Sequence, residues 1–312
     1  GGVNRRRHGQ LLLHLLDLGV PRSKIQLWHQ LVDGEPGTSG LMDWPITESY
    51  VRAVGAAFGV RTLFQWRWGG FEGELLKDNA RSRPVSFDTQ EGGLGTAGGT
   101  NRAKVATRLR FPQKTSNLQV RWCSAALKID VAALALNNDR ALKRARILFL
   151  TGERRQESAG RSRYATVERH RCHTRSRVVH QWRAVLDWDE DRVWQTIARH
   201  RVVSHVAYAL GFGRVSCATC IFADADQWAT IRKIDRHRFD KILAYERAFG
   251  CTITRGAGVA AMADRGTPFR EAGDADLVRL ALSHRYDRPV LLPAGETWFA
   301  PAGAFKRSGG PT

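Results

Sequence analysis

Short apolar runs alternate with segments of helical spacing along the first half of the chain. "KIQLWHQLVD" (24–33), "RTLFQWRW" (61–68) and "ARILFLTGE" (145–153) have the character of buried strands. "TESYVRAVGAAFGV" (47–60) and "VRWCSAALKIDVAALALN" (120–137) have the spacing of helices. This alternation predicts an α/β fold with a parallel sheet and helices on both faces. In such folds, ligands bind beyond the carboxyl ends of the strands.

The pattern changes along the chain and suggests three parts. Residues 1–186 form the α/β domain, residues 187–267 are a helical part that contains cysteines, and residues 268–312 are poorly determined by the sequence. The tail from Pro301 has the composition of a disordered segment. Around residues 82–100, Gly, Thr, Ser and charged residues replace any periodicity, so we expect a mobile Gly-rich loop there. Such a loop is either a linker or a flap over a ligand.

No apolar run reaches the length that a membrane span requires. The early "LLLHLLDLG" is short and is interrupted by His14 and Asp17, so we expect neither a span nor a secretion signal. Five cysteines in 312 residues are too few and too scattered for a disulfide framework. The sequence therefore predicts a cytoplasmic protein whose cysteines are thiols or metal ligands.

The chain is strongly basic, with a formal net charge of +19 from 49 Lys and Arg against 30 Asp and Glu. Such an excess favours partners that carry phosphate. The other interpretation is an arginine-rich composition that covers the surface without a specific role. Because the basic residues are dispersed, the charge suits a nucleotide as well as a polynucleotide.

A cluster of cationic residues follows the strand-like run that ends near Gly152. The segment "TGERRQESAGRSRY" (151–164) brings Arg154, Arg155, Ser158 and Arg161 to the place where a sheet presents a ligand. Guanidinium groups suit phosphate and sulfate oxygens, and a helix start adds backbone donors. An anion site and a solvated basic loop are both consistent with these residues.

Four stretches resemble one protein family, in the same order as in that family. They are "RWCSAALKID" (121–130), "LFLTGERRQES" (148–158), "WRAVLDWDEDRVWQTI" (182–197) and "GFGRVSCATCIFADADQWATIRKID" (211–235). In them the chain resembles the phosphoadenosine phosphosulfate (PAPS) reductase family of the adenine nucleotide α-hydrolase-like superfamily. The resemblance implies a Rossmann-like sheet in residues 1–186 that binds ATP or PAPS, with chemistry at the α-phosphate or on an attached sulfur.

The chain departs from the family pattern near both ends. Where the family has a phosphate loop of the type Ser-Gly-Gly-Lys-Asp-Ser, this chain has "GGVNRRRHGQ". Gly1 and Gly2 match the glycine pair and Arg5 to Arg7 could supply cations, but the Lys, Asp and Ser are missing. The tail "APAGAFKRSGGPT" has no cysteine, whereas assimilatory reductases use a cysteine near their C-terminus. The sequence therefore does not predict the usual PAPS reduction.

The resemblance also implies a role for three cysteines. Cys217 and Cys220 form a CxxC pair, which supplies two metal ligands from one turn. In one branch of the family, cysteines at these positions and at Cys123 hold a [4Fe–4S] cluster and move sulfur onto DNA or tRNA. Cys172 and Cys251 are candidates for a fourth ligand. A zinc site and ordinary buried thiols remain alternatives.

These observations lead to two functional hypotheses. The first is an enzyme that binds an adenine nucleotide at Gly1, Gly2, Gly152, Arg154, Arg155, Ser158 and Arg161 and carries out sulfur transfer or sulfonucleotide reduction. Its metal centre would be Cys123, Cys217 and Cys220, and its partners a DNA or tRNA acceptor and an electron or sulfur donor protein. The second is a catalytically impaired nucleotide- or nucleic-acid-binding protein with a structural zinc or no metal.

Overall fold

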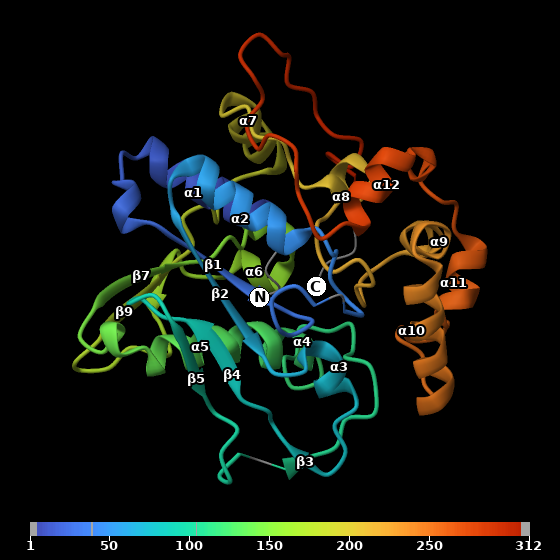
Figure 1. Ribbon diagram of the computed structural model, residues 1–312, viewed down its shortest axis with the longest axis horizontal. Coiled ribbons are helices and arrows are strands. Elements are labelled where there is room, and N and C mark those ends of the chain that lie inside the picture. Colours follow the sequence, from blue (N-terminus) through green and yellow to red (C-terminus); the bar gives the residue numbers. More distant parts are fainter. Residues whose placement is uncertain (1–4, 39, 104, 307–312) are drawn as a thin grey trace.

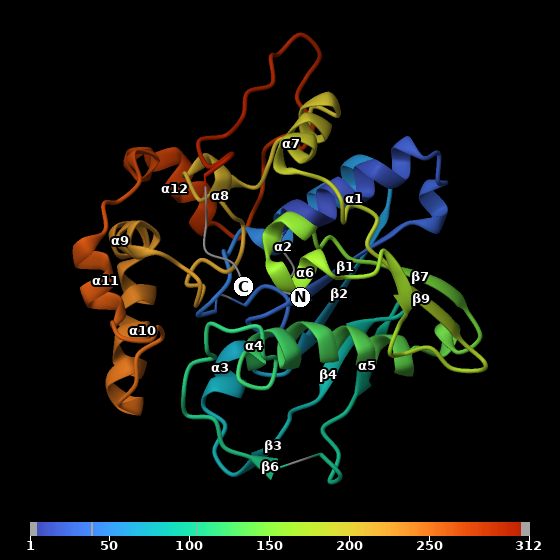
Figure 2. The same ribbon diagram turned by 180° about the vertical axis from the view of Figure 1, so that it is seen from behind.

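The computed structural model describes residues 5–38, 40–103 and 105–306, with side chains from Gly9 onward (Figures 1 and 2). The strands are β1 (Gln26–Leu31), β2 (Arg61–Arg67), β3 (Ala80–Arg81), β4 (Val85–Asp88), β5 (Leu94–Ala97), β6 (Val105–Ala106), β7 (Arg146–Leu150), β8 (Val167–Arg169) and β9 (Val178–Trp182). The helices are α1 (Arg5–Asp17), α2 (Thr47–Phe58), α3 (Gly70–Leu75), α4 (Trp122–Ser124), α5 (Asp130–Asn138), α6 (Ala159–Ser162), α7 (Glu190–Arg199), α8 (Val206–Ala209), α9 (Ala225–Ile234), α10 (Arg236–Phe249), α11 (Val259–Arg265) and α12 (Ala275–Leu282). A π-helical turn, Ala125–Ile129, joins α4 to α5.

The strands form mixed sheets rather than one purely parallel sheet. The first has the order β1-β2-β4-β5, in which β1 and β2 are parallel and β4 and β5 are antiparallel additions. The second has the order β7-β9-β8, with β7 and β9 parallel. A short pair, β3-β6, stands apart. The predicted Rossmann-like α/β architecture with parallel strands is confirmed, and β4, β5 and β8 add antiparallel strands to it.

Residues 82–100, predicted as one irregular loop, contain β4 and β5 instead. Val85 and Phe87 alternate along β4 and are buried in a cluster with Val131 and Ala135 of α5. Gly95 stands opposite Phe87, and a Cβ at Gly95 would lie 2.5 Å from that ring. The glycines that suggested a loop therefore permit a tightly packed hairpin.

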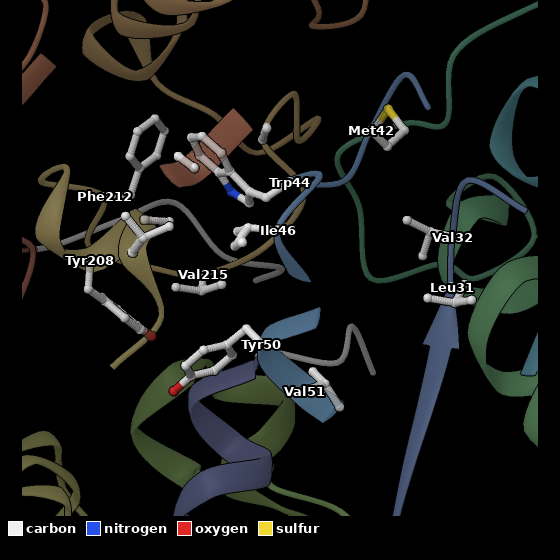
Figure 3. Close-up of a cluster of buried hydrophobic side chains, with 14 of the residues drawn as sticks. Leu31, Val32, Met42, Trp44, Ile46, Tyr50, Val51, Tyr208, Phe212 and Val215 are labelled. Atoms are coloured by element: carbon white, nitrogen blue, oxygen red, sulfur yellow. The ribbon is translucent and has the colours of Figure 1, made fainter. Parts of the chain in front are cut away.

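Helices cover both faces of the first sheet. On one face, α2 packs its buried apolar residues against β1 and β2, and α1 belongs to the same core. On the other face, α5 packs along β1, β2, β4 and β5. Figure 3 shows the large core around Trp44, Tyr50, Tyr208 and Phe212, where residues from the segment before α2 meet residues from α8. This core joins the α/β part to the helical part.

Helices α9 to α12 gather at one side of the molecule, away from β7 and β9 (Figures 1 and 2). Of the tail predicted to be disordered, residues 301–306 contact α8, since the Gly303 N–H donates to the Tyr208 carbonyl at 2.8 Å. Residues 307–312 lie outside the described residues. Within the described ranges, each helix is too short or too polar to cross a bilayer.

Candidate functional site

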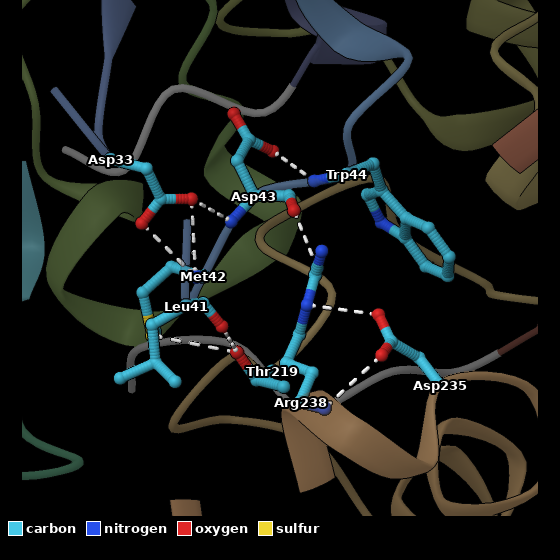
Figure 4. Close-up of polar contacts among 8 residues, drawn as sticks. All are labelled: Asp33, Leu41, Met42, Asp43, Trp44, Thr219, Asp235 and Arg238. Carbon is cyan, nitrogen blue, oxygen red and sulfur yellow. Dashed lines mark hydrogen bonds and ion pairs between the residues drawn. The ribbon is translucent and has the colours of Figure 1, made fainter. Parts of the chain in front are cut away.

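Asp33 lies two residues beyond the end of β1, and its carboxylate holds the following segment in place. Its carboxylate accepts hydrogen bonds from the backbone N–H groups of Met42, at 3.0 Å, and Asp43, at 2.5 Å (Figure 4). Gly70 has φ +52°, and a Cβ there would lie 2.1 Å from the Asp33 carbonyl carbon, so only glycine allows α3 to start against this turn. Desolvation and the nearby Asp43 carboxylate raise the pKa of Asp33 to about 6.

The segment that Asp33 holds in place also anchors the CxxC loop. Thr219, between the two cysteines, is fully buried and donates its hydroxyl to the Leu41 carbonyl at 2.6 Å. Arg238 of α10 donates to the Asp43 carbonyl at 2.5 Å and pairs with Asp235 at 3.0 Å (Figure 4). These bonds bring Cys217 and Cys220 to the carboxyl end of β1.

Cys123 reaches the same place from the neighbouring strand. Arg67, the last residue of β2, donates its Nε–H to the Ala126 carbonyl at 2.9 Å, inside the π-helical turn that follows Cys123. Trp122 packs on Phe71 of α3 with their ring centroids 4.9 Å apart. π-Helical turns are rare and often occur at functional sites. The carboxyl ends of β1 and β2 therefore position the two cysteine segments.

The three predicted cysteines line one cavity of about 40 Å³. Burial raises the pKa of the Cys123 and Cys217 thiols, and a negative charge on Cys220 would raise both pKa values further. The remaining wall combines apolar groups with cationic and hydroxyl side chains, contributed by Val32, Met42, Phe71, Arg121, Ser124, Leu127, Lys128, Arg214, Ser216, Ile221 and Phe222. The cavity is a thiol-rich, cationic pocket.

The two other cysteines lie elsewhere. Cys172 is buried against Ala133 and Leu136 of α5, with its thiol 3.9 Å from the Ala133 carbonyl, and Cys251 follows α10. Neither lines the cavity of the three thiols. The structure therefore does not bring the predicted fourth-ligand candidates to it.

The thiols as arranged do not fit a metal centre. Among the residues that the structure describes, no group of three or more His, Cys, Asp or Glu side chains is placed to hold a metal ion. The 40 Å³ cavity has room for roughly three water molecules, which is too small for a four-iron cluster. Lys128 and two arginines also line it and disfavour a bound cation such as Zn²⁺.

A larger cavity of about 200 Å³ adjoins the same strand end, and Val32 lines both cavities. Its polar lining includes the carboxylates of Asp33, Asp43 and Glu48. Carboxylates accept hydrogen bonds from hydroxyl and amino groups but repel phosphates. No sequence pattern was assigned to this cavity, although the Asp33-Gly34 pair just beyond a buried strand is a signal for it.

The predicted phosphate-binding segment follows β7, but its arginines are already paired within the protein. Glu157 lies 3.6 Å from the Nε of Arg154 and also accepts from Arg161. Ser158 caps α6, since its hydroxyl accepts from the Arg161 N–H at 3.3 Å. The structure therefore places a carboxylate between two of the predicted phosphate ligands.

Arg155 is paired as well, because its Nε–H donates to Asp187 at 2.5 Å. Gly152 is buried just beyond β7. Gly1 and Gly2 lie outside the described residues.

The basic segment nevertheless approaches the thiol cavity. Burial lowers the pKa of Arg121, and the nearby charges of Arg161 and Arg214 lower it further, although the Cys123 thiolate would oppose this. Arg121 and Arg214 thus line the thiol cavity, and the charge of Arg161 acts on Arg121.

Comparison with known proteins bears on the central part of this site. The family model described as phosphoadenosine phosphosulfate reductase domain matches residues 100–223, which include Cys123, the basic segment and the CxxC pair. An uncharacterized 37.8 kDa protein in the gpa 5' region of Escherichia phage 186 is 26% identical over 147 residues. That match spans 47% of this chain and 42% of the phage protein, so it covers less than half of the relative.

Proposed function

We propose, from the match of the family model over residues 100–223, that the chain belongs to the phosphoadenosine phosphosulfate reductase family, binds an adenine nucleotide and carries out sulfur chemistry at its thiols. The observation that carries the proposal is the meeting of Cys123, Cys217 and Cys220 at one cationic cavity beyond β1. Ligands of open α/β sheets bind at such strand ends. The thiols are therefore where a nucleotide would present its reacting group.

The two cavities suggest how the nucleotide lies. The uncharged adenosine suits the 200 Å³ cavity, where Asp33 and Glu48 can accept hydrogen bonds from ribose hydroxyls or the adenine amino group. The phosphates would avoid these carboxylates and turn toward Arg161 and Arg121. In this pose the segment after β7 lies on the phosphate side of the site, with Gly152, Arg154, Arg155 and Ser158.

Thiols alone can supply the electrons for sulfonucleotide reduction. In this proposal Cys217 and Cys220 form a disulfide and release two protons, and their two electrons reduce the sulfonyl sulfur. The bond between that sulfur and the phosphate oxygen breaks, which releases sulfite and the nucleoside phosphate. A thiol-reducing donor protein would then restore the pair.

Sulfur transfer onto DNA or tRNA is the second candidate, together with nucleic-acid binding without catalysis. The net charge of +19 favours a polynucleotide partner. A DNA or tRNA affinity that falls steeply with salt, without any turnover of nucleotide, would favour the binding role. A [4Fe–4S] cluster or zinc would require the three thiol segments to rearrange, so metal content is a separate measurement.

The test combines binding and turnover on the full chain. Calorimetric titrations with adenosine, ATP and PAPS measure binding, and sulfite release from PAPS with dithiothreitol measures reduction. We expect binding of all three compounds and sulfite release that a Cys217→Ser, Cys220→Ser variant loses. The matched control is Cys172→Ser, because Cys172 is buried away from the cavity. Failure of adenosine and ATP to bind would overturn the proposal.

A further inference from the structure

The positive charge of the chain is concentrated around the second sheet. Residues 140–182, which contain β7, β8 and β9, have 12 arginines and lysines against 3 glutamates. The net charge of the whole chain is +19, so this short segment supplies much of it. Figures 1 and 2 show β7 and β9 at one side of the molecule, away from α9 to α12. The second sheet is therefore the most basic part of the fold.

The three glutamates of this segment do not neutralise its surface. Glu157 pairs with Arg154 and Arg161, and the other two glutamates pair with Arg183, at 3.8 and 2.5 Å. Several exposed cations of the segment are left without a carboxylate partner among the described residues. They are Lys143, Arg144, Arg146, Arg169 and Arg175.

The register of the second sheet places two of these cations on one face. Side chains in register on neighbouring strands point to the same face, as do side chains two residues apart on one strand. Leu148 is in register with His180, and His180 is in register with Arg169. Arg146 lies two residues before Leu148 on β7. All four side chains are exposed and share this face.

The opposite face of the sheet is the packed one. There, Ile147 and Phe149 of β7 pack on a buried cluster that includes residues of α5. On the exposed face, α1 reaches only one end, where the His14 ring lies 6.2 Å from the Trp182 ring. Val167, in register with Trp182 on the same face, is 54% exposed. The rest of this face is open to solvent.

Two turns extend the basic surface beyond the open face. The Val178 N–H donates to the Ala145 carbonyl at 3.0 Å, so the turn before β7 lies beside the turn before β9. These turns carry Lys143, Arg144 and Arg175. Because β7 and β9 are parallel, the cations of both turns lie at the same edge of the sheet. Positive charge therefore continues from this edge across the face.

The open face combines cations with apolar and imidazole groups. Guanidinium groups bind phosphate oxygens. Leu148, which is 50% exposed, Val167 and His180 offer surface on which unpaired bases can lie. A duplex would turn its phosphates toward the face and leave these side chains unused. A membrane surface calls for a larger apolar area, such as that of an amphipathic helix. The face therefore fits a single strand of nucleic acid.

The side chains of the face also favour DNA over RNA. Recognition of RNA uses the ribose 2′-hydroxyl, which carboxylate, amide and hydroxyl side chains contact well. Along β7, β9 and β8, the register places no such side chain on the open face. Its members are Arg146, Leu148, Leu150, Val167, Arg169, Val178, His180 and Trp182.

We propose that the open face of β7, β9 and β8 binds single-stranded DNA, with Arg146 and Arg169 on phosphates and Leu148 and His180 against bases. The inference rests on the nucleic-acid candidate proposed above and gives that candidate a surface. None of these four residues lines either of the two cavities. The surface is therefore separate from the proposed nucleotide site.

The test measures the fluorescence anisotropy of labelled oligothymidine with the full chain at several salt concentrations. We expect Arg146→Gln, Arg169→Gln to weaken binding roughly tenfold at low salt. The slope of log affinity against log salt should fall by about 1.4, because two phosphate contacts are lost. The matched control is Arg270→Gln, Arg279→Gln, which removes two exposed positive charges in the helical part. An equal loss in both double variants would mean that binding follows net charge alone, and would overturn the proposal.

Competitors decide which polymer the face binds. We expect unlabelled oligothymidine to compete better than a duplex, oligouridine, an abasic strand of the same length or phosphatidylserine vesicles. Leu148→Ser should weaken binding of oligothymidine and leave binding of the abasic strand unchanged. Equal competition by the abasic strand would contradict the base contacts. Stronger competition by the duplex, oligouridine or the vesicles would overturn the assignment to single-stranded DNA.

A parallel titration with adenosine keeps the proposals distinguishable. Arg146→Gln, Arg169→Gln should bind adenosine as the unaltered chain does and unfold at the same temperature, because neither arginine has a described ion-pair partner to lose. DNA binding that this variant does not weaken would remove the surface and leave the nucleic-acid candidate. DNA binding that the variant loses, in a chain that does not bind adenosine, would keep the surface and remove the proposed nucleotide function.

Discussion

Asp33 and Asp43 meet at the carboxyl end of β1, where the backbone N–H of Asp43 donates to the Asp33 carboxylate at 2.5 Å while the Asp43 side chain repels it. The pKa of Asp33 is about 6 in the folded chain, above the usual value of an aspartate. The folded state therefore binds this proton more tightly than the unfolded state does. The stabilisation that comes from protonated Asp33 is complete below about pH 4 and is lost as the pH rises through about 6.

The change that tests this relationship is Asp33→Asn. We compare the unfolding free energies of the unaltered chain and the variant at pH 4 and at pH 7. From pH 4 to pH 7 the unaltered chain should lose up to about 3 kcal/mol relative to the variant, because the asparagine does not titrate. Urea unfolding at several pH values measures it. The control is the exposed Asp276→Asn, which should give a difference that does not change with pH. A pH-independent difference for Asp33→Asn would contradict the assignment.

Glu74 of α3 is the centre of a buried ion cluster and should be essential for stability. It is 1% exposed and lies 3.2 Å from Lys77, 2.9 Å from Arg108 and 3.8 Å from Arg67. Burial alone would raise the pKa of Glu74, but these three cations lower it below its usual value. The stabilisation is therefore present at neutral pH and lost as the pH falls through that lowered pKa.

Glu74→Gln leaves the buried cations without their partner. We expect a loss of about 3–5 kcal/mol in the free energy of unfolding, measured in urea at pH 7. Asp240→Asn, which breaks an exposed pair with Arg236, should have a much smaller effect, because solvent screens that pair. Equal effects of the two substitutions would show that the cluster around Glu74 is solvated.

Local periodicity predicted the elements that carry their own signal. The β1, β2 and β7 strands and the α2 and α5 helices lie where their apolar spacing placed them. The β4–β5 hairpin was missed because its glycines suit a cross-strand contact, the approach of Gly95 to the Phe87 ring. Composition alone does not distinguish such a contact from an irregular Gly-rich loop.

The sequence indicated which residue types form the site, but it did not indicate which distant segments come together there. The meeting of Cys123 with Cys217 and Cys220 depends on the Thr219 bond to Leu41 and the Arg67 bond to Ala126, which join distant segments. No spacing rule could give these bonds, and only the family resemblance indicated the result.

By contrast, the pairing of Arg154 and Arg161 with Glu157 follows helical spacing of three and four residues and could have been predicted. The same sequence pattern that suggested an anion site therefore also contained its internal counter-charge.

That pairing makes a prediction for nucleotide binding. Glu157→Gln removes the negative charge between Arg154 and Arg161, while Arg154 keeps its bonds to Gln156 and the Trp188 carbonyl, so phosphate oxygens meet less repulsion there. We expect ATP to bind at least threefold more tightly at low salt, with adenosine unchanged, because only ATP carries phosphates. Calorimetric titration of both compounds measures the ratio. Weaker ATP binding would mean that Glu157 holds the arginines in their binding positions.

The last prediction concerns metal content. Because no described His, Cys, Asp or Glu group is placed to hold a metal, and cations line the small cavity, we expect anaerobically purified protein to lack stoichiometric iron, sulfide and zinc. Incubation with a chelator should then leave the unfolding midpoint unchanged. Visible absorption and metal analysis of the same sample check the first point. A broad iron–sulfur band that Cys217→Ser, Cys220→Ser abolishes and Cys172→Ser retains would contradict it. Such a result would mean that the segments carrying Cys123 and the CxxC pair move apart to admit a cluster, and the thiol mechanism would give way to one in which the cluster handles sulfur.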